Sequence, residues 1–381
     1  MPITNPTSAG LYIHFPWCIQ KCPYCDFNSH TLKGDLPEDQ YINRLLLEVE
    51  EMSQVWPSRQ INSIFMGGGT PSLFKGQSLG KLLDELHKRL NIDAKCEITI
   101  EANPGSDPEL KSIRNAGINR LSIGVQSFNN MHLKSLGRIH TAEHAIRTFS
   151  KARDAGFDNI NIDIMFALIK QTTEELEQDL YTAISLEPDH LSWYQLTLEP
   201  NTLFHYQPPA IPDDETADTM FLIGQEIITN AGLHQYEISA YTRNKACSHN
   251  INYWSYGDYF GIGAGAHGKW TDDEIYRHMT IKHPKHYLMS QTATANIQTV
   301  DYEQRLFEYF LNRSRMPGSI KLTQIAEAIG WHEDRLYEIF QSDQFKPFVQ
   351  FKTKCTMILT RNVIRFNNNF LEEIMQISQY S

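Results

Sequence analysis

The stretch 11-LYIHFPWCIQKCPYCDFNSH-30 decides how the rest of the chain is organised. An apolar run typical of a β-strand leads directly into three cysteines, Cys18, Cys22 and Cys25, separated by three and then two residues. Iron–sulfur clusters are usually held by four Cys thiolates. Three thiols in one short loop, with no fourth cysteine nearby, therefore predict a [4Fe–4S] cluster with one iron left for another ligand.

Two other uses of the loop stay open. A structural zinc site normally has a second CxxC or a pair of histidines at fixed spacing, and neither follows here, since His14 and His30 lie outside the compact loop. The other alternative is a set of plain or redox-active thiols. The remaining cysteines are scattered, as is usual in a reducing compartment, and Cys96 in the apolar run CEITIEA is expected to be buried and inert.

The order of apolar runs predicts an α/β fold. Strands are expected at 11–17, 61–66, 96–102, 119–125, 159–166 and 190–198, with helix-period segments between them. Thr172 or Thr173 with Glu175 predicts a capped start for the last of these helices. Six strand–helix units predict a parallel sheet with right-handed crossovers, forming an open, partial (β/α)6 barrel. We assign residues 1–235 to the barrel, 236–300 to an extension at the barrel edge, and 301–381 to a smaller, mainly helical domain, with a winged helix as the candidate arrangement.

Unusual residues cluster where these strands end. Gly67-Gly68-Gly69-Thr70-Pro71 follows the second strand, Glu101 ends the third, Gln126 ends the fourth, and Asp163 lies within the fifth. The carboxyl ends of parallel barrel strands form the active face, and the cysteine loop follows the first strand. Glycines let a backbone approach a ligand closely. The sequence therefore predicts one site built from five consecutive units.

Composition excludes several classes of protein. The chain has 34 basic and 45 acidic residues, a net charge of −11, which argues against a nucleic-acid partner. The first ten residues, MPITNPTSAG, have neither the basic nor the apolar region of a signal peptide. No apolar run approaches the length of a transmembrane helix. A cytoplasmic chain is the expectation.

The CxxxCxxC loop with its flanks, YIHFPWC and CPYCDF, resembles the radical S-adenosylmethionine (SAM) superfamily, and within it the anaerobic coproporphyrinogen III oxidase family. The resemblance implies that SAM binds the free iron through its amino and carboxylate groups and that an electron from the cluster cleaves it to a 5′-deoxyadenosyl radical. It also implies the partial barrel, a GGGTP element at the SAM amino group, and a Glu at the ribose hydroxyls. The residues that it places next to SAM are Tyr12, Tyr24, Gly68, Gly69, Thr70, Glu101, Gln126, Arg138 and Asp163.

Within this family, three features are similar to the haem-chaperone branch. Asp26-Phe27 stands where the oxidases have Gly-Cys, and only ten residues precede the first strand. The segment 249-HNINYW-254 is similar to an HNxxYW motif linked to haem handling, which makes His249 a candidate haem ligand. A structural histidine is the equal alternative. The stretch 166-FALIKQT-172 departs from the family's Gly-Leu-Pro-Gly before Gln-Thr, so we expect an altered loop after the fifth strand.

The resemblance implies a haem chaperone with a [4Fe–4S] cluster and SAM as cofactors and no assigned catalytic residue. Its implied partners are haem or another tetrapyrrole as cargo, a haem-accepting protein, and an electron donor such as a flavodoxin or ferredoxin. The alternative is an oxygen-independent coproporphyrinogen III oxidase, which converts propionates to vinyl groups. A third possibility is a non-catalytic Fe–S protein that senses oxygen or assembles a dimer.

Overall fold

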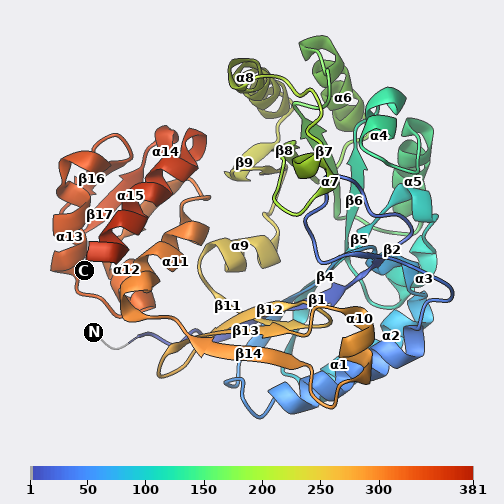
Figure 1. Ribbon diagram of the computed structural model, residues 1–381, viewed down its shortest axis with the longest axis horizontal. Coiled ribbons are helices and arrows are strands. Elements are labelled where there is room, and N and C mark those ends of the chain that lie inside the picture. Colours follow the sequence, from blue (N-terminus) through green and yellow to red (C-terminus); the bar gives the residue numbers. More distant parts are fainter. Residues whose placement is uncertain (1–2, 381) are drawn as a thin grey trace.

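A curved sheet forms the main part of the molecule (Figure 1). The computed structural model describes residues 3–380, with side chains to residue 377. Neighbouring strands follow the order β14-β13-β12-β11-β1-β4-β5-β6-β7-β8-β10-β9. These strands are β1 (Ser8–Phe15), β4 (Gln60–Gly68), β5 (Ile92–Ala102), β6 (Arg120–Gln126), β7 (Ile160–Phe166), β8 (His190–Gln195), β9 (His234–Glu237), β10 (Ala240–Thr242), β11 (Asp258–Ile262), β12 (His267–Thr271), β13 (Ile275–Thr280) and β14 (Thr294–Thr299).

All six predicted strands are present, and β1, β4, β5, β6, β7 and β8 pair in parallel in chain order. The prediction of a parallel sheet in an α/β fold is confirmed. The first strand was placed a few residues too late. It ends at Phe15 because Pro16, which has no backbone N–H, cannot continue the ladder of hydrogen bonds.

Helices cover the outer face of the sheet (Figure 1). They pack on its apolar side chains. In α2, Leu79, Leu82, Leu83 and Leu86 recur at helical spacing and are all buried. The predicted capped start is confirmed for α6, where Thr172 and Glu175 form a reciprocal capping box. The helices of this part are α1 (Glu38–Met52), α2 (Gly76–Arg89), α3 (Leu110–Asn115), α4 (Asn130–Ser135), α5 (Ala142–Asp154), α6 (Thr173–Ser185), α7 (Leu203–Tyr206), α8 (Asp214–Asn230) and α10 (Pro284–Met289).

The segment after α8 extends both ends of the sheet. Strands β9 and β10 add antiparallel beyond β8, whereas β11 pairs in parallel with β1 and is followed by antiparallel β12 to β14. Between β10 and β11 the chain forms α9 (Ser248–Trp254), which lies inside the curve of the sheet (Figure 1). The expected edge extension therefore adds strands at both edges of the sheet. The HNxxYW segment, in α9, connects the strands at one edge to those at the other.

The C-terminal part has its own apolar core, which includes Leu306, Phe310, Trp331 and Phe340. Its sheet is antiparallel, in the order β15-β17-β16. The elements are α11 (Arg305–Arg313), β15 (Gly318–Lys321), α12 (Leu322–Ile329), α13 (Glu333–Gln341), β16 (Val349–Thr353), β17 (Thr356–Leu359), α14 (Arg361–Arg365) and α15 (Asn367–Tyr380). From α11 to β17 the order helix, strand, helix, helix, strand, strand is that of a winged helix.

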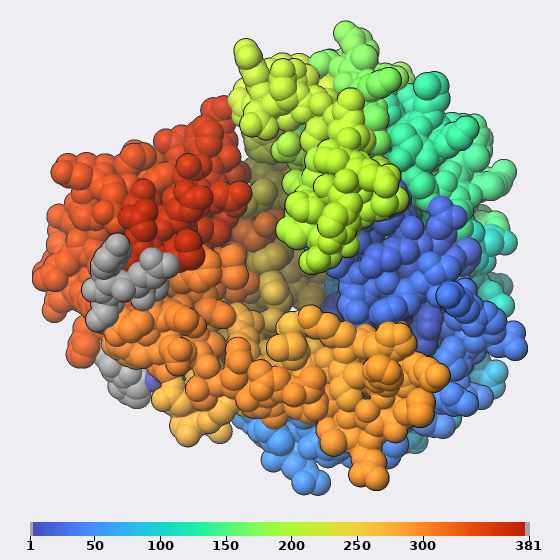
Figure 2. Space-filling model, in the orientation of Figure 1, coloured from blue at the N-terminus to red at the C-terminus, as the bar shows by residue number. Residues whose placement is uncertain are grey.

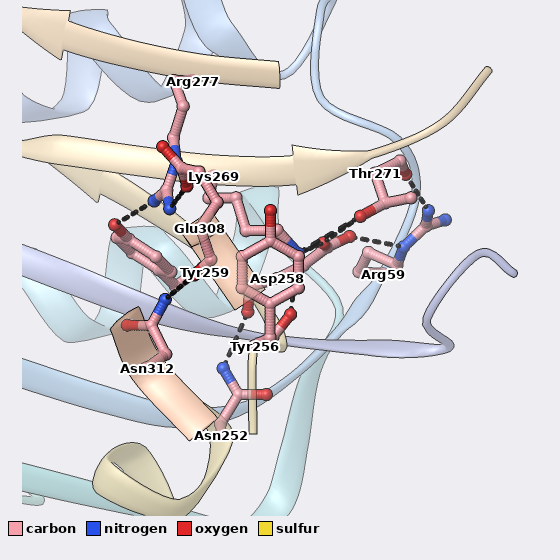
Figure 3. Close-up of polar contacts among 10 residues, drawn as sticks. All are labelled: Arg59, Asn252, Tyr256, Asp258, Tyr259, Lys269, Thr271, Arg277, Glu308 and Asn312. Atoms are coloured by element: carbon pink, nitrogen blue, oxygen red, sulfur yellow. Dashed lines mark hydrogen bonds and ion pairs between the residues drawn. The ribbon is translucent and has the colours of Figure 1, made fainter. Parts of the chain in front are cut away.

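A half-buried ion pair joins the edge extension to this C-terminal part, next to a fully buried pair within the extension (Figure 3). Arg277 of β13 forms an ion pair with Glu308 of α11 and donates to the Tyr259 hydroxyl over 2.9 Å. Beside them, the fully buried Lys269 ammonium donates to the Tyr256 carbonyl over 2.7 Å and pairs with Asp258. Burial lowers the pKa of Lys269 to about 8. Buried charges are tolerated when they are paired in this way.

Candidate functional site

A cavity of about 270 Å³ opens where the parallel strands end, beside the cysteine loop. It lies at the carboxyl ends of β4 to β8, as the sequence predicted for the active face. Of the residues predicted for the cluster and SAM, all except Tyr12 line this cavity: Cys18, Cys22, Cys25, Tyr24, Gly68, Gly69, Thr70, Glu101, Gln126, Arg138 and Asp163. Their assigned roles stay predictions, but the structure brings these side chains to one place.

Backbone pairing closes the cysteine loop at its base. The short strands β2 (Trp17–Cys18) and β3 (His30–Thr31) run parallel, and the N–H of Leu32 donates to the Cys18 carbonyl over 2.9 Å. The side-chain amide of Asn28 donates to the Ala264 carbonyl over 2.9 Å and to the Lys282 carbonyl over 2.8 Å. The edge extension, which is distant in sequence, therefore holds the loop that carries the cysteines.

The three thiols fit an open iron–sulfur cluster better than a zinc ion. All three are free, and burial raises the pKa of Cys18 and Cys25. Within residues 3–380, no three His, Cys, Asp or Glu side chains are grouped as the ligands of a metal ion. In a four-iron cube each thiolate binds a different iron, so the sulfurs need not meet at one point. A three-thiol set beside an open cavity leaves room for a ligand on the fourth iron.

Two glycines allow the Gly67–Thr70 segment to lie against the end of β1. At Gly68, φ is +108°, and an added Cβ would lie 2.3 Å from the His14 ring. At Gly69, an added Cβ would lie 2.4 Å from the Trp17 carbonyl oxygen. The N–H of Gly69 donates to the Phe15 carbonyl and that of Thr70 to the Trp17 carbonyl, both over 2.7 Å. Gly68 is therefore required by its close approach to His14 of β1, and Gly69 by its close approach to Trp17, which directly precedes Cys18.

Two carboxyl groups face the cavity from neighbouring parts of the barrel. Glu101 accepts a hydrogen bond from the Gly68 N–H over 3.0 Å. Burial, together with the nearby Asp163, raises the pKa of Glu101 to about 8. Burial also raises the pKa of Asp163, which accepts hydrogen bonds from Ser122 and Asn161. A protonated Glu101 carboxyl can both donate to and accept from ligand hydroxyl groups.

The cavity lining also includes a cation and an amide. Arg138 donates to the Gly124 carbonyl over 2.6 Å and to the Cys22 sulfur over 3.6 Å, while its Nε is buried without a partner. Gln126 accepts from the Tyr194 hydroxyl over 2.7 Å. Tyr194 was not predicted from the sequence. Since it lies near the end of the sixth strand, the rule about carboxyl ends would have found it.

Tyr12 and His249 lie deeper inside the barrel. The Tyr12 hydroxyl donates to His14 Nδ1 over 2.9 Å, and its ring stacks on Phe65. The His249 ring lies 5.1 Å from that of Phe65 and is hydrogen-bonded through Nδ1 to Ser63 over 3.2 Å. Burial lowers the pKa of His249 to about 4. Tyr12 thus supports His14 rather than lining the cavity, and His249 is packed as a core histidine.

A half-buried carboxylate holds the start of α9. Glu97 of β5 accepts hydrogen bonds from the N–H groups of Ser248 and His249 over 2.8 and 3.3 Å. Negative charge at a helix N-terminus is favourable. Sequence reasoning gave no role to Glu97, because its partner lies about 150 residues further along the chain and only the folded sheet joins them.

The loop after β7 does not line the cavity. Ala167 and Lys170, which stand at the two Gly positions of the family pattern, have φ of +55° and +56°. These values lie in the left-handed region that glycine adopts most readily. The loop instead joins a small apolar cluster in which Leu168 packs with Leu136 and Leu196. The departure of this loop from the family pattern therefore changes the backbone strain and the packing of the loop, not the lining of the cavity.

Comparison with known sequences identifies close relatives. The sequence profile of the Radical SAM superfamily matches residues 12–181. The heme chaperone HemW of Haemophilus influenzae is 46% identical over 341 residues, which are 87% of this chain and 88% of that protein. The heme chaperone HemW of Escherichia coli is 45% identical over 85% of this chain and 87% of its own length.

Among solved structures, the radical SAM enzyme coproporphyrinogen III oxidase (HemN) of Escherichia coli has the same fold. Its TM-score is 0.81 at 20% sequence identity, and the likeness covers 97% of this chain and 90% of that one. Radical SAM proteins use a [4Fe–4S] cluster and SAM, and the thiols and cavity described above fit both. In the part of the chain that is described, none of the helices has the length and apolar character needed to cross a membrane.

Proposed function

The chain belongs to the HemW family of heme chaperones within the radical SAM superfamily, and from this we propose that it binds haem and delivers it to recipient proteins. The observation that carries the proposal is the identity of 45–46% with two heme chaperones over 85–87% of the chain. The HNxxYW segment in α9 supports it further.

For the cofactors, we assign the cluster to Cys18, Cys22 and Cys25 and SAM to the adjoining cavity. A bound cluster and SAM supply one-electron chemistry at the sulfonium. The chain itself recognises SAM. The backbone of Gly68 and Gly69 lines the cavity, where it can hydrogen-bond a small zwitterion, and Glu101 lines the same cavity as a hydrogen-bonding partner for hydroxyl groups. Arg138 holds the cysteine loop against the barrel wall through Cys22.

Haem is assigned to the α9 region. The side chain of His249 is packed between β1 and β4, and the residue is only 7% exposed. As a haem ligand, His249 must therefore leave the barrel interior, so α9 has to move when haem binds. Asn250, Tyr253 and Trp254 on the same helix are half-buried and offer the accessible contacts.

The alternative reaction, decarboxylation of coproporphyrinogen III, is less well supported. That substrate has four propionates, and carboxylates are normally recognised by paired arginines. Among the described residues that line the cavity, Arg138 is the one cation, and its guanidinium already donates to Gly124 and Cys22. The fold likeness to HemN carries no information about substrate at 20% identity.

Anaerobically reconstituted protein with SAM and a reductant separates the two functions. We expect a stable haem complex by absorption titration, transfer of that haem to an apo-haem protein, and no vinyl product from coproporphyrinogen III. Stoichiometric or catalytic formation of the vinyl product, without haem binding, contradicts the chaperone proposal. Both assays use the same preparation. Its visible absorbance shows whether the cluster has assembled before either assay is read.

Two substitutions test the residue assignments separately. Cys22→Ala is expected to remove the visible absorbance of the cluster and all SAM cleavage. His249→Ala is expected to keep the cluster and to weaken haem binding at least tenfold. An unchanged haem affinity in His249→Ala means that haem binds elsewhere, whereas a loss of the cluster in this variant means that the histidine supports the barrel.

A further inference from the structure

A surface groove lies between the cysteine loop and α10. Its volume is about 770 Å³, within the range of about 300–1,000 Å³ that is typical of small-molecule and cofactor sites. Its walls come from residues between 17 and 40 and between 283 and 289, two segments that the hydrogen bond from Asn28 to the Lys282 carbonyl joins. Figure 2 shows the two segments side by side, in blue and orange. The groove is distinct from the cavity at the cysteines, because of the described residues Ser29 alone lines both.

Three histidines, His30, His283 and His286, lie together at this groove, and we call them the histidine group. The centre of the His283 ring lies 5.3 Å from that of His30 and 4.8 Å from that of His286. His283 and His286 are exposed and His30 is half-buried. Burial, followed by the charge of neighbouring His283, lowers the pKa of His30. A neutral imidazole is the form that binds metals, so the group offers accessible nitrogen ligands.

Hydrogen bonds fix the orientation of one of these rings. The side-chain amide of Asn28 donates to the carbonyl oxygens of Ala264 and Lys282, so the side-chain oxygen of Asn28 is left as an acceptor. His30 Nε2 lies 3.3 Å from that oxygen and therefore carries the hydrogen. His30 Nδ1 is then the nitrogen with a free lone pair. A hydrogen bond at one ring nitrogen is the usual way to orient the other nitrogen towards a metal.

The histidine group suits a metal that already carries most of its ligands. Over residues 3–380, no three His, Cys, Asp or Glu side chains are placed to enclose a bare metal ion. A haem iron has four porphyrin nitrogens and needs one or two ligands from the protein. Leu32, Pro284 and Leu288 line the groove with apolar surface for the macrocycle, and Met289, which is 74% exposed, adds to it. The walls therefore fit a haem better than an ion.

The charges in the groove have the sign that haem propionates require. Lys33 and Lys285 line the groove and are exposed, and among the described side chains neither has an ion-pair partner. Asp35 is the one acidic residue in the described lining. Ammonium groups bind carboxylates through charge-assisted hydrogen bonds. On a chain with a net charge of −11, this groove is therefore a local site for an anionic ligand.

We propose that the groove is a second haem site, in which the histidine group ligates the iron and the two groove lysines pair with the propionates. This inference deepens the proposed function and rests on it. Binding forms an Fe–N bond to an imidazole and releases a solvent ligand from the iron, without a change in oxidation state. His249 is only 7% exposed, whereas His283 reaches a haem without any movement of α9. The groove thus takes up haem at the surface and leaves it accessible to a recipient protein.

Variants built on His249→Ala test the groove, because this background removes the α9 ligand. His283→Ala/His286→Ala is added to that chain and compared with His144→Ala/His332→Ala, which removes two exposed histidines outside the groove. A further chain adds Lys33→Gln/Lys285→Gln. Each anaerobically reconstituted protein is titrated with ferric haem and, separately, with iron-free protoporphyrin IX, and binding is followed by absorbance.

We expect the His249→Ala chain to keep a haem with the Soret band of an imidazole-ligated iron. Addition of His283→Ala/His286→Ala should weaken this binding about tenfold or more, equivalent to about 1.4 kcal/mol, while the control pair leaves it unchanged. The lysine pair should weaken it about fivefold at low salt, as expected for two exposed ion pairs. Protoporphyrin IX, which has no iron to ligate, should bind about tenfold more weakly than haem.

Three results overturn the proposal. Equal haem affinities of the histidine variant and its control exclude the histidine group as the ligand, and protoporphyrin IX that binds as tightly as haem excludes an Fe–N bond. A His249→Ala chain that binds no haem, although wild type does, overturns the groove site and leaves the proposed function intact. A wild-type chain that binds no haem overturns the proposed function and this inference together.

Discussion

Replacement of Asn28 by aspartate is expected to loosen the cysteine loop. The Asn28 amide donates two hydrogen bonds, to the carbonyl oxygens of Ala264 and Lys282. Each is worth about 0.5–1.5 kcal/mol net, so their loss costs about 1–3 kcal/mol. Aspartate has nearly the same shape but only accepts hydrogen bonds, so its charge would face both carbonyl oxygens. We therefore expect Asn28→Asp to cost more than Asn28→Ala, about 2–4 kcal/mol in all.

Hydrogen–deuterium exchange measures this loosening locally, because a segment can open without global unfolding. Tenfold faster exchange corresponds to about 1.4 kcal/mol. Amides of residues 19–31 should therefore exchange roughly tenfold faster in Asn28→Ala and faster still in Asn28→Asp. Asn115→Asp provides the control, because it makes the same chemical change at an exposed site.

Two results would refute this reasoning. Exchange of residues 19–31 that stays within about threefold of wild type in both variants would mean that Asn28 does not hold the loop. Faster exchange throughout the barrel would mean that Asn28 contributes to global stability, not to the local closure of the loop on the edge extension.

Three further predictions concern the same framework. Burial raises the pKa of Glu48 to about 7, so the contribution of its protonated form to stability is complete below the unfolded pKa of 4.5 and is lost as the pH rises through 7. Between about pH 5 and pH 8, the unfolding free energy of wild type should therefore fall by about 3 kcal/mol relative to that of Glu48→Gln, as measured by urea titrations. Parallel curves of unfolding free energy against pH for the two proteins would contradict this. Gly68→Ala should destabilise the chain and abolish SAM cleavage because the added Cβ meets the His14 ring. The control is Gly156→Ala, where φ is +89° but no atom lies within 4 Å of the added Cβ. This control should show only the cost of backbone strain, about 1–2 kcal/mol. Lys170→Gly should raise the thermal midpoint slightly, by relieving up to about 1 kcal/mol at φ of +56°, and a lower midpoint would show that the Lys side chain contributes more than the strain costs.

Local sequence patterns predicted the barrel and most of its site. Runs such as 159-NINIDIMF-166 are apolar enough to be buried on both faces, which is the property that parallel strands require. The ends of such strands meet at one edge, so the placement of Glu101, Gln126 and Asp163 around one cavity followed from their positions at or near strand ends.

Side-chain direction within the barrel did not follow from these patterns. Tyr12 and His14 point to the same side of β1 because they are two residues apart, and their hydrogen bond places Tyr12 behind His14 instead of in the cavity. Tyr194 reaches the cavity from β8, and its hydroxyl meets Gln126 of β6 over the intervening strand β7. Such contacts depend on the curvature of the sheet, which local sequence does not encode.

By itself, the sequence determined the chemistry of this protein: three thiols at cluster spacing, a glycine segment and carboxyl groups at strand ends, because these depend on residues close together in the chain. Only the tertiary structure decided where His249 faces and what holds the cysteine loop. Helix α9 crosses from one sheet edge to the other, and Asn28 bonds to Ala264, 236 residues away. Contacts of that separation form only when the whole sheet has assembled and curved, so no local pattern records them.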